Sequence, residues 1–196
     1  MRLLSLVVAS VAGAVVVAGG ASGAQDNART PKSRANAPYN ITTPFGIIYK
    51  IHARETVPYA KKHAAGTIVV HTGERYLYDV LGDGQAIRYT IGVGREGHSF
   101  AGVSMISAKR EWPDWSPTPN IRKLQPELPG HVKGGEQNPL GARALYLGAS
   151  LYRIHGTNEP WKIGDAVSSG CIRLTNDDII DLYNRSRIGA TVIVQR

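Results

Sequence analysis

The sequence lacks several features that would assign it to a special class of protein. It has a single cysteine, Cys171, which excludes an intramolecular disulfide, so a hydrophobic core has to hold the fold together. The 22 glycines and 11 prolines exclude long uninterrupted helices. Of the 196 residues, 42% are hydrophobic and 19% are charged, so the chain is neither a disordered polymer nor a fibre and fits one ordinary domain or a domain with a tail.

Basic residues outnumber acidic ones by 23 to 15, a net charge of +8 that favours anionic partners. They form no run of five, and neither zinc-finger spacing nor an aromatic RNA-binding signature is present. Nucleic acid is therefore not an expected partner. We interpret the charge as a solvated basic surface. It does not choose between phosphorylated polymers and carboxylate-rich cell walls, so peripheral contact with an anionic cell wall stays one of the alternatives. The sequence leaves the oligomeric state unknown.

The first 24 residues have the order of a secretory signal. Arg2 precedes an apolar stretch over 3–18, and small residues over 19–24 follow. We expect cleavage after Ala24 and export to the periplasm or cell envelope. An uncleaved anchor is the alternative, because residues 3–21 are close to the length of about 20 apolar residues that a membrane span needs.

The next segment, 25–60, is predicted to be a flexible linker or N-terminal arm. Residues 25–40 contain almost no large apolar side chain and cannot bury enough surface to become ordered. Residues 41–50 turn apolar and are interpreted as a strand or an extended arm, and 59–66 as a polar connection. The folded domain is assigned to 61–196.

That domain is predicted to be mostly β. The β-branched run 67–71, the alternating run 75–81 and the run 85–93 predict a three-stranded meander. Its second turn, 82–84, is Gly-Asp-Gly, which tolerates the positive φ of a tight hairpin.

The segment 94–141 is predicted to be long and irregular, interrupted only by a strand over 103–107. Such a loop inside a domain is often a lid or a substrate-binding loop. Trp112 and Trp115 within it are interpreted as local packing, with an apolar wall over a cleft as the alternative.

The C-terminal part is predicted to contain strands over 144–147, 151–155 and 190–194. Thr175 is an N-cap candidate, followed by an apolar stripe that predicts one short helix ending near Arg187. The fold class is therefore a mostly antiparallel β domain with one short C-terminal helix and a long loop or lid.

The chemistry-bearing residues lie in two glycine-flanked segments, 153–158 and 168–174. A thiol becomes a strong nucleophile beside an imidazole, and with a carbonyl substrate it gives a thioester. Cys171 and His155 form such a pair, and the amides of Gly170 and Cys171 are candidates for an oxyanion hole, which typically contributes roughly 3 kcal/mol. The alternative is an inert buried cysteine, but Cys171 has small and polar neighbours. No ligand pair shows metal-type spacing, so neither a metal nor a cofactor is expected.

These residues resemble the catalytic domain of the L,D-transpeptidases, also called the YkuD-like domain. The family pattern is a His-Gly segment and, roughly fifteen residues later, Ser-x-Gly-Cys-x-Arg or Asn. It is matched here by His155-Gly156-Thr157-Asn158 and by Ser168-Ser169-Gly170-Cys171-Ile172-Arg173. A looser likeness covers about 67–194 and includes Asn138-Pro139-Leu140-Gly141.

The resemblance implies an antiparallel β-sandwich and an exported cysteine transpeptidase that acts on peptidoglycan stem peptides. It implies that Cys171 is the nucleophile, that His155 is the general base and that Gly170 lies in the oxyanion hole. Release of D-alanine and transfer of the acyl group to a diaminopimelate amine would give a 3-3 crosslink. The substrate-binding residues it implies are Arg173, Ser168, Ser169, Gly156 and Thr157. Many family members have a second histidine where this chain has Ser169.

Two alternatives remain open. The same acyl-enzyme could pass its acyl group to water, to a D-amino acid or to a lysine of an envelope protein. A module that binds the cell wall without catalysis is the alternative from another class.

Overall fold

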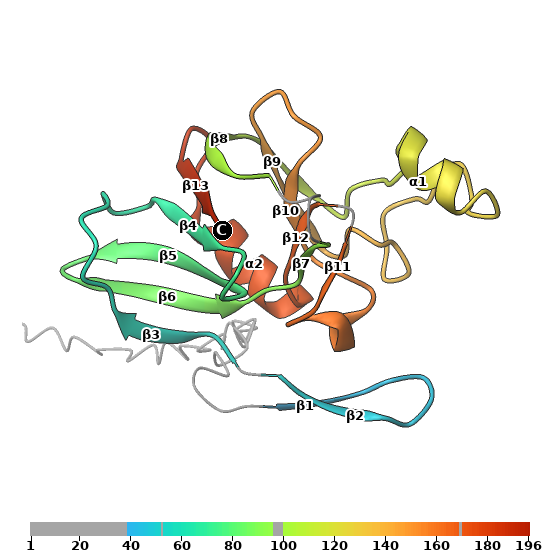
Figure 1. Cartoon of the computed structure of the whole chain (residues 1–196), viewed down its shortest axis with the longest axis horizontal. Coiled ribbons are helices and arrows are strands. Elements are labelled where there is room, and N and C mark those ends of the chain that lie inside the picture. The colour runs from blue at the N-terminus through green and yellow to red at the C-terminus, as the bar shows by residue number, and fades with distance from the viewer. Residues whose placement is uncertain (1–38, 52, 96–99, 169) are drawn as a thin grey trace, which may run out of the picture. The chain divides into compact units, whose positions relative to one another are not determined.

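The computed structural model describes residues 39–51, 53–95, 100–168 and 170–196 (Figure 1). The predicted signal segment 1–24, the first part of the predicted linker and Ser169 lie outside the described residues. Among those described, no helix is both long and apolar enough to cross a membrane.

Short strands dominate the described chain, as the sequence predicts. The N-terminal strands are β1 (Tyr39–Thr42), β2 (Ile48–Ile51), β3 (Glu55–Pro58), β4 (Ile68–His71), β5 (Tyr76–Gly82), β6 (Gln85–Thr90) and β7 (Val93–Gly94). The later strands are β8 (Gly102–Glu111), β9 (Arg143–Leu147), β10 (Arg153–His155), β11 (Ala166–Ser168), β12 (Ile172–Arg173) and β13 (Thr191–Gln195). The helices are α1 (Pro119–Leu124), the 3-10 turn η1 (Pro160–Lys162) and α2 (Asn176–Arg185).

The main sheet has the strand order β12-β10-β9-β8-β13-β4-β5-β6-β3. Its neighbours pair antiparallel except β10 with β12 and β13 with β4, which are parallel. β8 joins the two halves, because residues 102–105 pair with β13 while the rest, after a register shift near Ile106, pairs with β9. The prediction of a mostly antiparallel β fold is confirmed.

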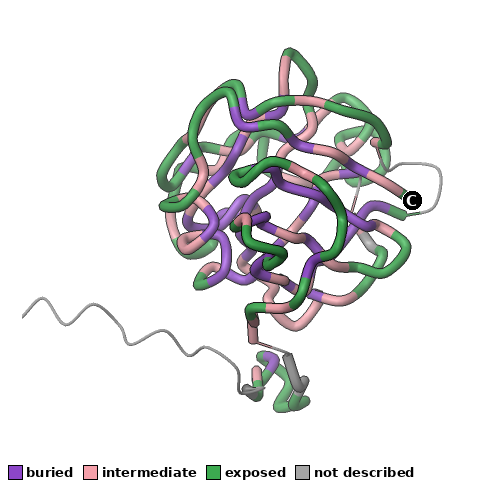
Figure 2. Tube along the Cα trace, turned by 90° about the vertical axis from the view of Figure 1, so that its left-hand side faces the viewer, coloured by how far each residue is buried: buried purple, intermediate pink, exposed green. Residues whose placement is uncertain are grey.

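The hydrophobic core lies between the halves of this sheet and under α2. Buried positions, purple in Figure 2, run through the interior of the strand-rich body. Both halves and the helix contribute residues that are completely buried: Ile68, Leu77, Tyr89, Ile106, Leu145, Leu147, Ile154, Leu174, Ile179 and Leu182. Ile154 on β10 and Ile172 on β12 thus anchor the strands that carry the candidate site to the core.

The predicted meander is β4-β5-β6, with antiparallel register throughout. Its second turn contains Asp83 at φ 49° and Gly84 at φ 72°, the positive values that the Gly-Asp-Gly sequence predicts. The predicted helix is α2, where Thr175 is the N-cap and its side chain accepts a hydrogen bond from the amide of Asp178. It ends at Arg185, two residues before the predicted end.

The segment 94–141 contains more regular structure than the sequence predicts. The expected strand over 103–107 is part of the ten-residue β8, and α1 is a second short helix. Trp115 pairs with Val132 in an isolated bridge, while Trp112 is 41% exposed. The lid interpretation therefore applies only to the irregular chain around α1.

The arm before the folded domain also contains regular structure in its described part. β1 and β2 form an antiparallel hairpin where the sequence predicts a single strand or extended arm. β3 extends the sheet by pairing with β6.

Candidate active site

The two motif segments meet on adjacent parallel strands. In the pairing of β10 with β12, Ile154 lies opposite Ile172 and His155 opposite Arg173. Both isoleucines are buried in the core. Because side chains alternate along a strand, His155 and Arg173 project from the other face, where Cys171, one residue before β12, joins them.

Close packing next to β10 explains why the residue after the histidine is glycine. A Cβ at Gly156 would lie 2.3 Å from Oδ1 of Asn176. The same oxygen accepts hydrogen bonds from the amides of Ala142 at 2.9 Å and Thr157 at 3.3 Å. Asn176, at the start of α2, therefore fixes the backbone on both sides of the histidine.

His155 is 5% exposed, and its Nδ1 lies 2.6 Å from the carbonyl oxygen of Gly156. A carbonyl oxygen only accepts, so Nδ1 carries the proton and Nε2 is left as the basic nitrogen. Burial, helped by the nearby charges of Arg173 and Arg153, lowers the pKa of His155 to about 3. The imidazole is therefore neutral at pH 7 and can accept a proton.

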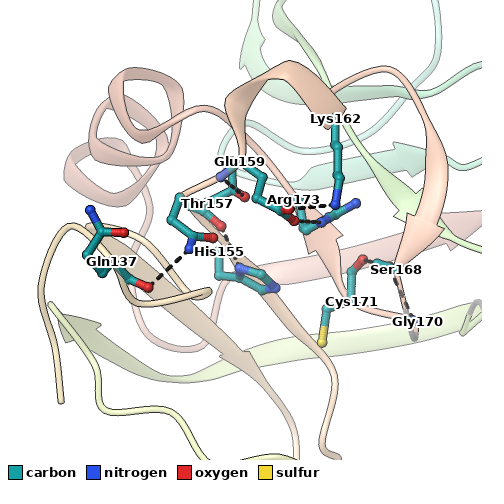
Figure 3. A network of polar contacts seen from close by, with 11 residues as sticks. Gln137, His155, Thr157, Glu159, Lys162, Ser168, Gly170, Cys171 and Arg173 are labelled. Atoms are coloured by element: carbon teal, nitrogen blue, oxygen red, sulfur yellow. Dashed lines mark hydrogen bonds and ion pairs between the residues drawn. The ribbon is translucent and has the colours of Figure 1, made fainter. Parts of the chain in front are cut away.

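Cys171 is partly buried, and its thiol is directed at the carbonyl oxygen of Leu151, 3.9 Å away. Burial raises the pKa of Cys171, while a hydrogen bond to the Arg153 backbone and the charges of Arg153 and Arg173 act in the opposite direction. Within the described chain no hydrogen bond joins this sulfur to His155, although Figure 3 shows the free ring nitrogen on the Cys171 side of the imidazole. The resting pair is a neutral thiol beside a neutral base.

The loop before the cysteine is held by Ser168. Its hydroxyl donates to the carbonyl oxygen of Cys171 at 2.7 Å and accepts from the amide of Gly170 at 3.2 Å. Gly170 has φ 123°, a value that side chains rarely allow. Ser168 thus shapes the turn that presents the thiol, and the Gly170 amide points at this hydroxyl in the resting conformation.

Arg173 lies beside the thiol with most of its side chain buried. Its Nη1 is 3.8 Å from Oε2 of Glu159, whose other oxygen is 2.5 Å from Nζ of Lys162 (Figure 3). Nε and Nη2 of Arg173 are buried and have no hydrogen-bond partner in the described part of the chain. Buried donors of this kind usually have a partner.

The loop that contains Gln137 and Asn138 lies on the side of His155 away from Cys171 (Figure 3). Asn138 is completely buried, and its amide group donates to the carbonyl oxygens of Val132 at 2.9 Å and Lys133 at 3.0 Å. Asn158 then donates to the carbonyl oxygen of Gln137 at 3.0 Å. The irregular chain after α1 is thereby tied to the segment that follows His155.

The structure places most of the predicted site residues together. Cys171, His155 and Arg173 share one face, Ser168 and Gly170 form the adjoining turn, and Gly156 and Thr157 follow the histidine. Thr157 is buried, and its hydroxyl accepts a hydrogen bond from the amide of Glu159, so it holds the backbone. Ser169 lies outside the described residues. No three His, Cys, Asp or Glu side chains converge as metal ligands among the residues with described positions.

Sequence reasoning missed Asn176 and Glu159. Asn176 follows the N-cap and gave no signal beyond helix initiation, since its role depends on a turn at Gly141 that is distant in sequence. Glu159 and Lys162 are separated by three residues on a short turn, a spacing that could have indicated an ion pair.

Comparison with known proteins gives a match over this whole region. The family model of the YkuD L,D-transpeptidase catalytic domain matches residues 65–194, well over half of the chain. The matched range starts before β4 and includes both His155 and Cys171.

Curated relatives have the same description. The probable L,D-transpeptidase ErfK/SrfK of Escherichia coli K12 is 42% identical over 132 residues, which are 64% of this chain and 42% of that protein. The probable L,D-transpeptidase YcfS of the same organism is 38% identical over 157 residues, 75% of this chain and 48% of that protein. The chain thus spans less than half the length of these relatives.

The fold is shared with a solved structure. The L,D-transpeptidase from Mycobacterium smegmatis superimposes with a TM-score of 0.54 at 17% identity, covering 83% of this chain and 68% of that one. At this identity the likeness concerns the fold alone.

Proposed function

Since the chain belongs to the L,D-transpeptidase catalytic domain family, we propose that it is a cysteine transpeptidase that acts on peptidoglycan stem peptides. The observation that carries this proposal is the shared face of β10 and β12: His155 lies opposite Arg173, and Cys171 directly precedes β12, with the imidazole and thiol side chains on the same side of the strand pair (Figure 3). A neutral base with one protonated nitrogen, next to a thiol, is the arrangement that general-base activation of a nucleophile requires.

Acylation would begin with attack of the Cys171 sulfur on the carbonyl carbon between the third and fourth residues of a stem tetrapeptide. The thiol proton passes to Nε2 of His155 as the sulfur–carbon bond forms. The imidazolium then protonates the departing amine, the carbon–nitrogen bond breaks and D-alanine leaves. The product is a thioester on Cys171, with His155 neutral again.

Transfer would use the same groups in reverse. The amine of a second stem peptide, from its diaminopimelate side chain, attacks the thioester and gives its proton to Nε2 of His155. The sulfur leaves as a thiolate and recovers the proton, and a new amide forms the 3-3 crosslink. The resting neutral pair is consistent with this cycle, because no ion pair has to be dismantled before either attack.

Substrate recognition is proposed to involve Arg173. Stem peptides carry carboxylates, and the buried N–H groups of Arg173 that have no partner among the described residues lie on the same face as the nucleophile. A carboxylate between them would form charge-assisted hydrogen bonds of the strong bidentate kind. Ser168, Gly156 and Thr157 would act by fixing the backbone that borders the bound peptide. The amide of Cys171 would face the oxyanion, and that of Gly170 would join it after releasing the Ser168 hydroxyl.

The compartment follows from the same proposal. A peptidoglycan substrate requires an exported enzyme, which agrees with the basic end, apolar stretch and small residues of positions 1–24. Export is tested by expressing the full chain and locating it by cell fractionation. A mature N-terminus near Gln25 is expected, whereas a full-length cytoplasmic product would contradict export.

The function itself is tested by incubating the purified protein with stem tetrapeptides or muropeptides and identifying the products by mass spectrometry. Crosslinked dimers with released D-alanine are expected. Tripeptide alone would show hydrolysis, and a replaced fourth residue would show exchange with a D-amino acid. If no product forms while the protein still binds sacculi, the chain is a wall-binding module.

A further inference from the structure

Arg153 occupies a distinct position next to the nucleophile. The parallel register sets Ile154 opposite Ile172, and its continuation by one residue sets Arg153 opposite Cys171. Since both isoleucines are buried, Arg153 and Cys171 project from the same face. The arginine is thus the cross-strand neighbour of the cysteine, just as Arg173 is the cross-strand neighbour of His155.

The side chain of Arg153 is held in place but its charge is not neutralised. Its guanidinium carbon lies 5.1 Å from the centroid of the Tyr146 ring, on neighbouring β9. Its Nε is buried and has no hydrogen-bond partner, and no carboxylate in the described ranges forms an ion pair with it. Arg173, in contrast, contacts Glu159, and Arg143 on β9 contacts Glu111 at 3.1 Å.

Among the described residues, few charged groups act on Cys171. β10 supplies Arg153 and His155, β12 supplies Arg173, and β11 supplies no charged side chain. His155 is neutral and Arg173 is shared with Glu159, so Arg153 is the least compensated positive charge beside the sulfur. Its backbone also takes part in a hydrogen bond with Cys171.

We propose that Arg153 stabilises the thiolate form of Cys171 across the β10–β12 pair, a positioning role that rests on the proposed function of Cys171 as the nucleophile. The same positive charge also lowers the pKa of His155. In this chain, where Ser169 provides no imidazole next to the cysteine, the cation comes from the neighbouring strand.

The test measures the rate of iodoacetamide alkylation of Cys171 against pH, which reports thiolate formation without requiring transpeptidase activity. Arg153→Met is expected to move the midpoint of this profile up by about one pH unit and to slow alkylation at pH 7 about tenfold. Arg153→Lys, which keeps the charge, is expected to recover most of the wild-type rate. Arg110→Met is the matched control, because Arg110 is exposed on β8 and lies outside the proposed site.

A profile of Arg153→Met that superimposes on the wild-type profile would overturn the proposal. If Arg153→Met does not fold, Arg153→Gln is measured instead, with circular dichroism to confirm the fold and the same outcomes applying. If the profile moves as expected but muropeptides give no product, the proposed function fails and the role of Arg153 stands. If crosslinked products form but the alkylation profile of Arg153→Met does not move, the proposed function stands and the role of Arg153 fails.

Discussion

The β4-β5-β6 meander and the β10–β12 pair occupy opposite parts of one sheet. They differ in whether their buried polar groups have hydrogen-bond partners within the fold. In the meander the inward side chains are apolar apart from Asp79, which is buried, and Tyr89, whose phenol donates to Asp181 at 2.6 Å. On the outward face of β10 and β12, a histidine is buried as a neutral base, and Arg153 and Arg173 have buried N–H groups without a hydrogen-bond partner in the described part of the chain. The meander thus gives its buried phenol a partner inside the fold, whereas the β10–β12 face contains buried arginine N–H groups that have no partner among the described residues.

The largest effect is expected at the base. His155→Ala should lower the rate of acylation by a stem tetrapeptide about 10²–10⁴-fold, because the thiol loses its proton acceptor. The rate is measured by the appearance of D-alanine. His131→Ala is the control, since His131 is an exposed side chain that contacts Asp114. Equal rates for the two variants would contradict the role of His155.

A substitution in the core of the meander should lower the stability of the fold and leave the acylation rate unchanged. Leu77 is completely buried in β5, so Leu77→Ala should reduce the free energy of unfolding by about 2–5 kcal/mol. Leu81→Ala on the same strand removes a side chain that is 38% exposed and should have a smaller effect. Urea denaturation gives both values. Acylation per folded molecule should be unchanged, and a selective loss of activity in Leu77→Ala would show that the two regions are coupled.

The Asn176 contact joins stability and activity. Asn176→Ala removes the acceptor shared by the amides of Ala142 and Thr157, which should reduce the free energy of unfolding by about 1–3 kcal/mol and slow acylation. Asn184→Ala, at an exposed position of the same helix, is the matched control. A variant that loses stability but retains the full acylation rate would show that the position of His155 does not depend on the hydrogen bonds accepted by Asn176.

The two regions should also respond to pH with opposite sign. Burial lowers the pKa of His155 to about 3, below its unfolded value, so its contribution to stability is present above pH 6.5 and is lost as the pH falls toward 3. Burial raises the pKa of Asp79, on β5, to about 6, so ionised Asp79 destabilises the fold above that pH and protonation restores stability below it.

The sign is checked with Tm measurements across pH. Asp79→Asn should raise the Tm at pH 8 and have a smaller effect at pH 5. His155→Gln should reduce the loss of Tm between pH 7.5 and pH 4.5. If Asp79→Asn lowers the Tm at pH 8, the aspartate is stabilising in its ionised form and the assignment of its buried state is wrong.

Elements whose signal lies in neighbouring residues were predicted from the sequence, and elements that depend on distant residues were not. The meander and α2 were predicted because their signals are local: alternating apolar and polar residues, a Gly-Asp-Gly turn and an N-cap threonine. β8 was predicted too short, since its second half contains Lys109, Arg110 and Glu111 and has no apolar alternation. The two-residue strands β7 and β12 depend on partners far along the chain and have no pattern of their own.

The same distinction separates the site residues that were predicted from those that were missed. The two motif segments predicted that His155 and Cys171 act together, and the β10–β12 register sets His155 opposite Arg173, two residues after Cys171. Asn176 and Arg153 were missed because their roles depend on which strand or turn lies opposite them. The sequence also gives no account of the neutral resting pair, since burial, which lowers the pKa of His155 and raises that of Cys171, is a property of the folded chain.

The most direct test of the central claim is the intact mass of the protein after brief incubation with a stem tetrapeptide and no acceptor, followed by peptide mapping. A mass increase equal to the tripeptide acyl group, located on Cys171 and absent from Cys171→Ala, is the predicted result. An adduct that persists in Cys171→Ala, or tetrapeptide cleavage by that variant at the wild-type rate, would contradict the assignment of this sulfur as the nucleophile.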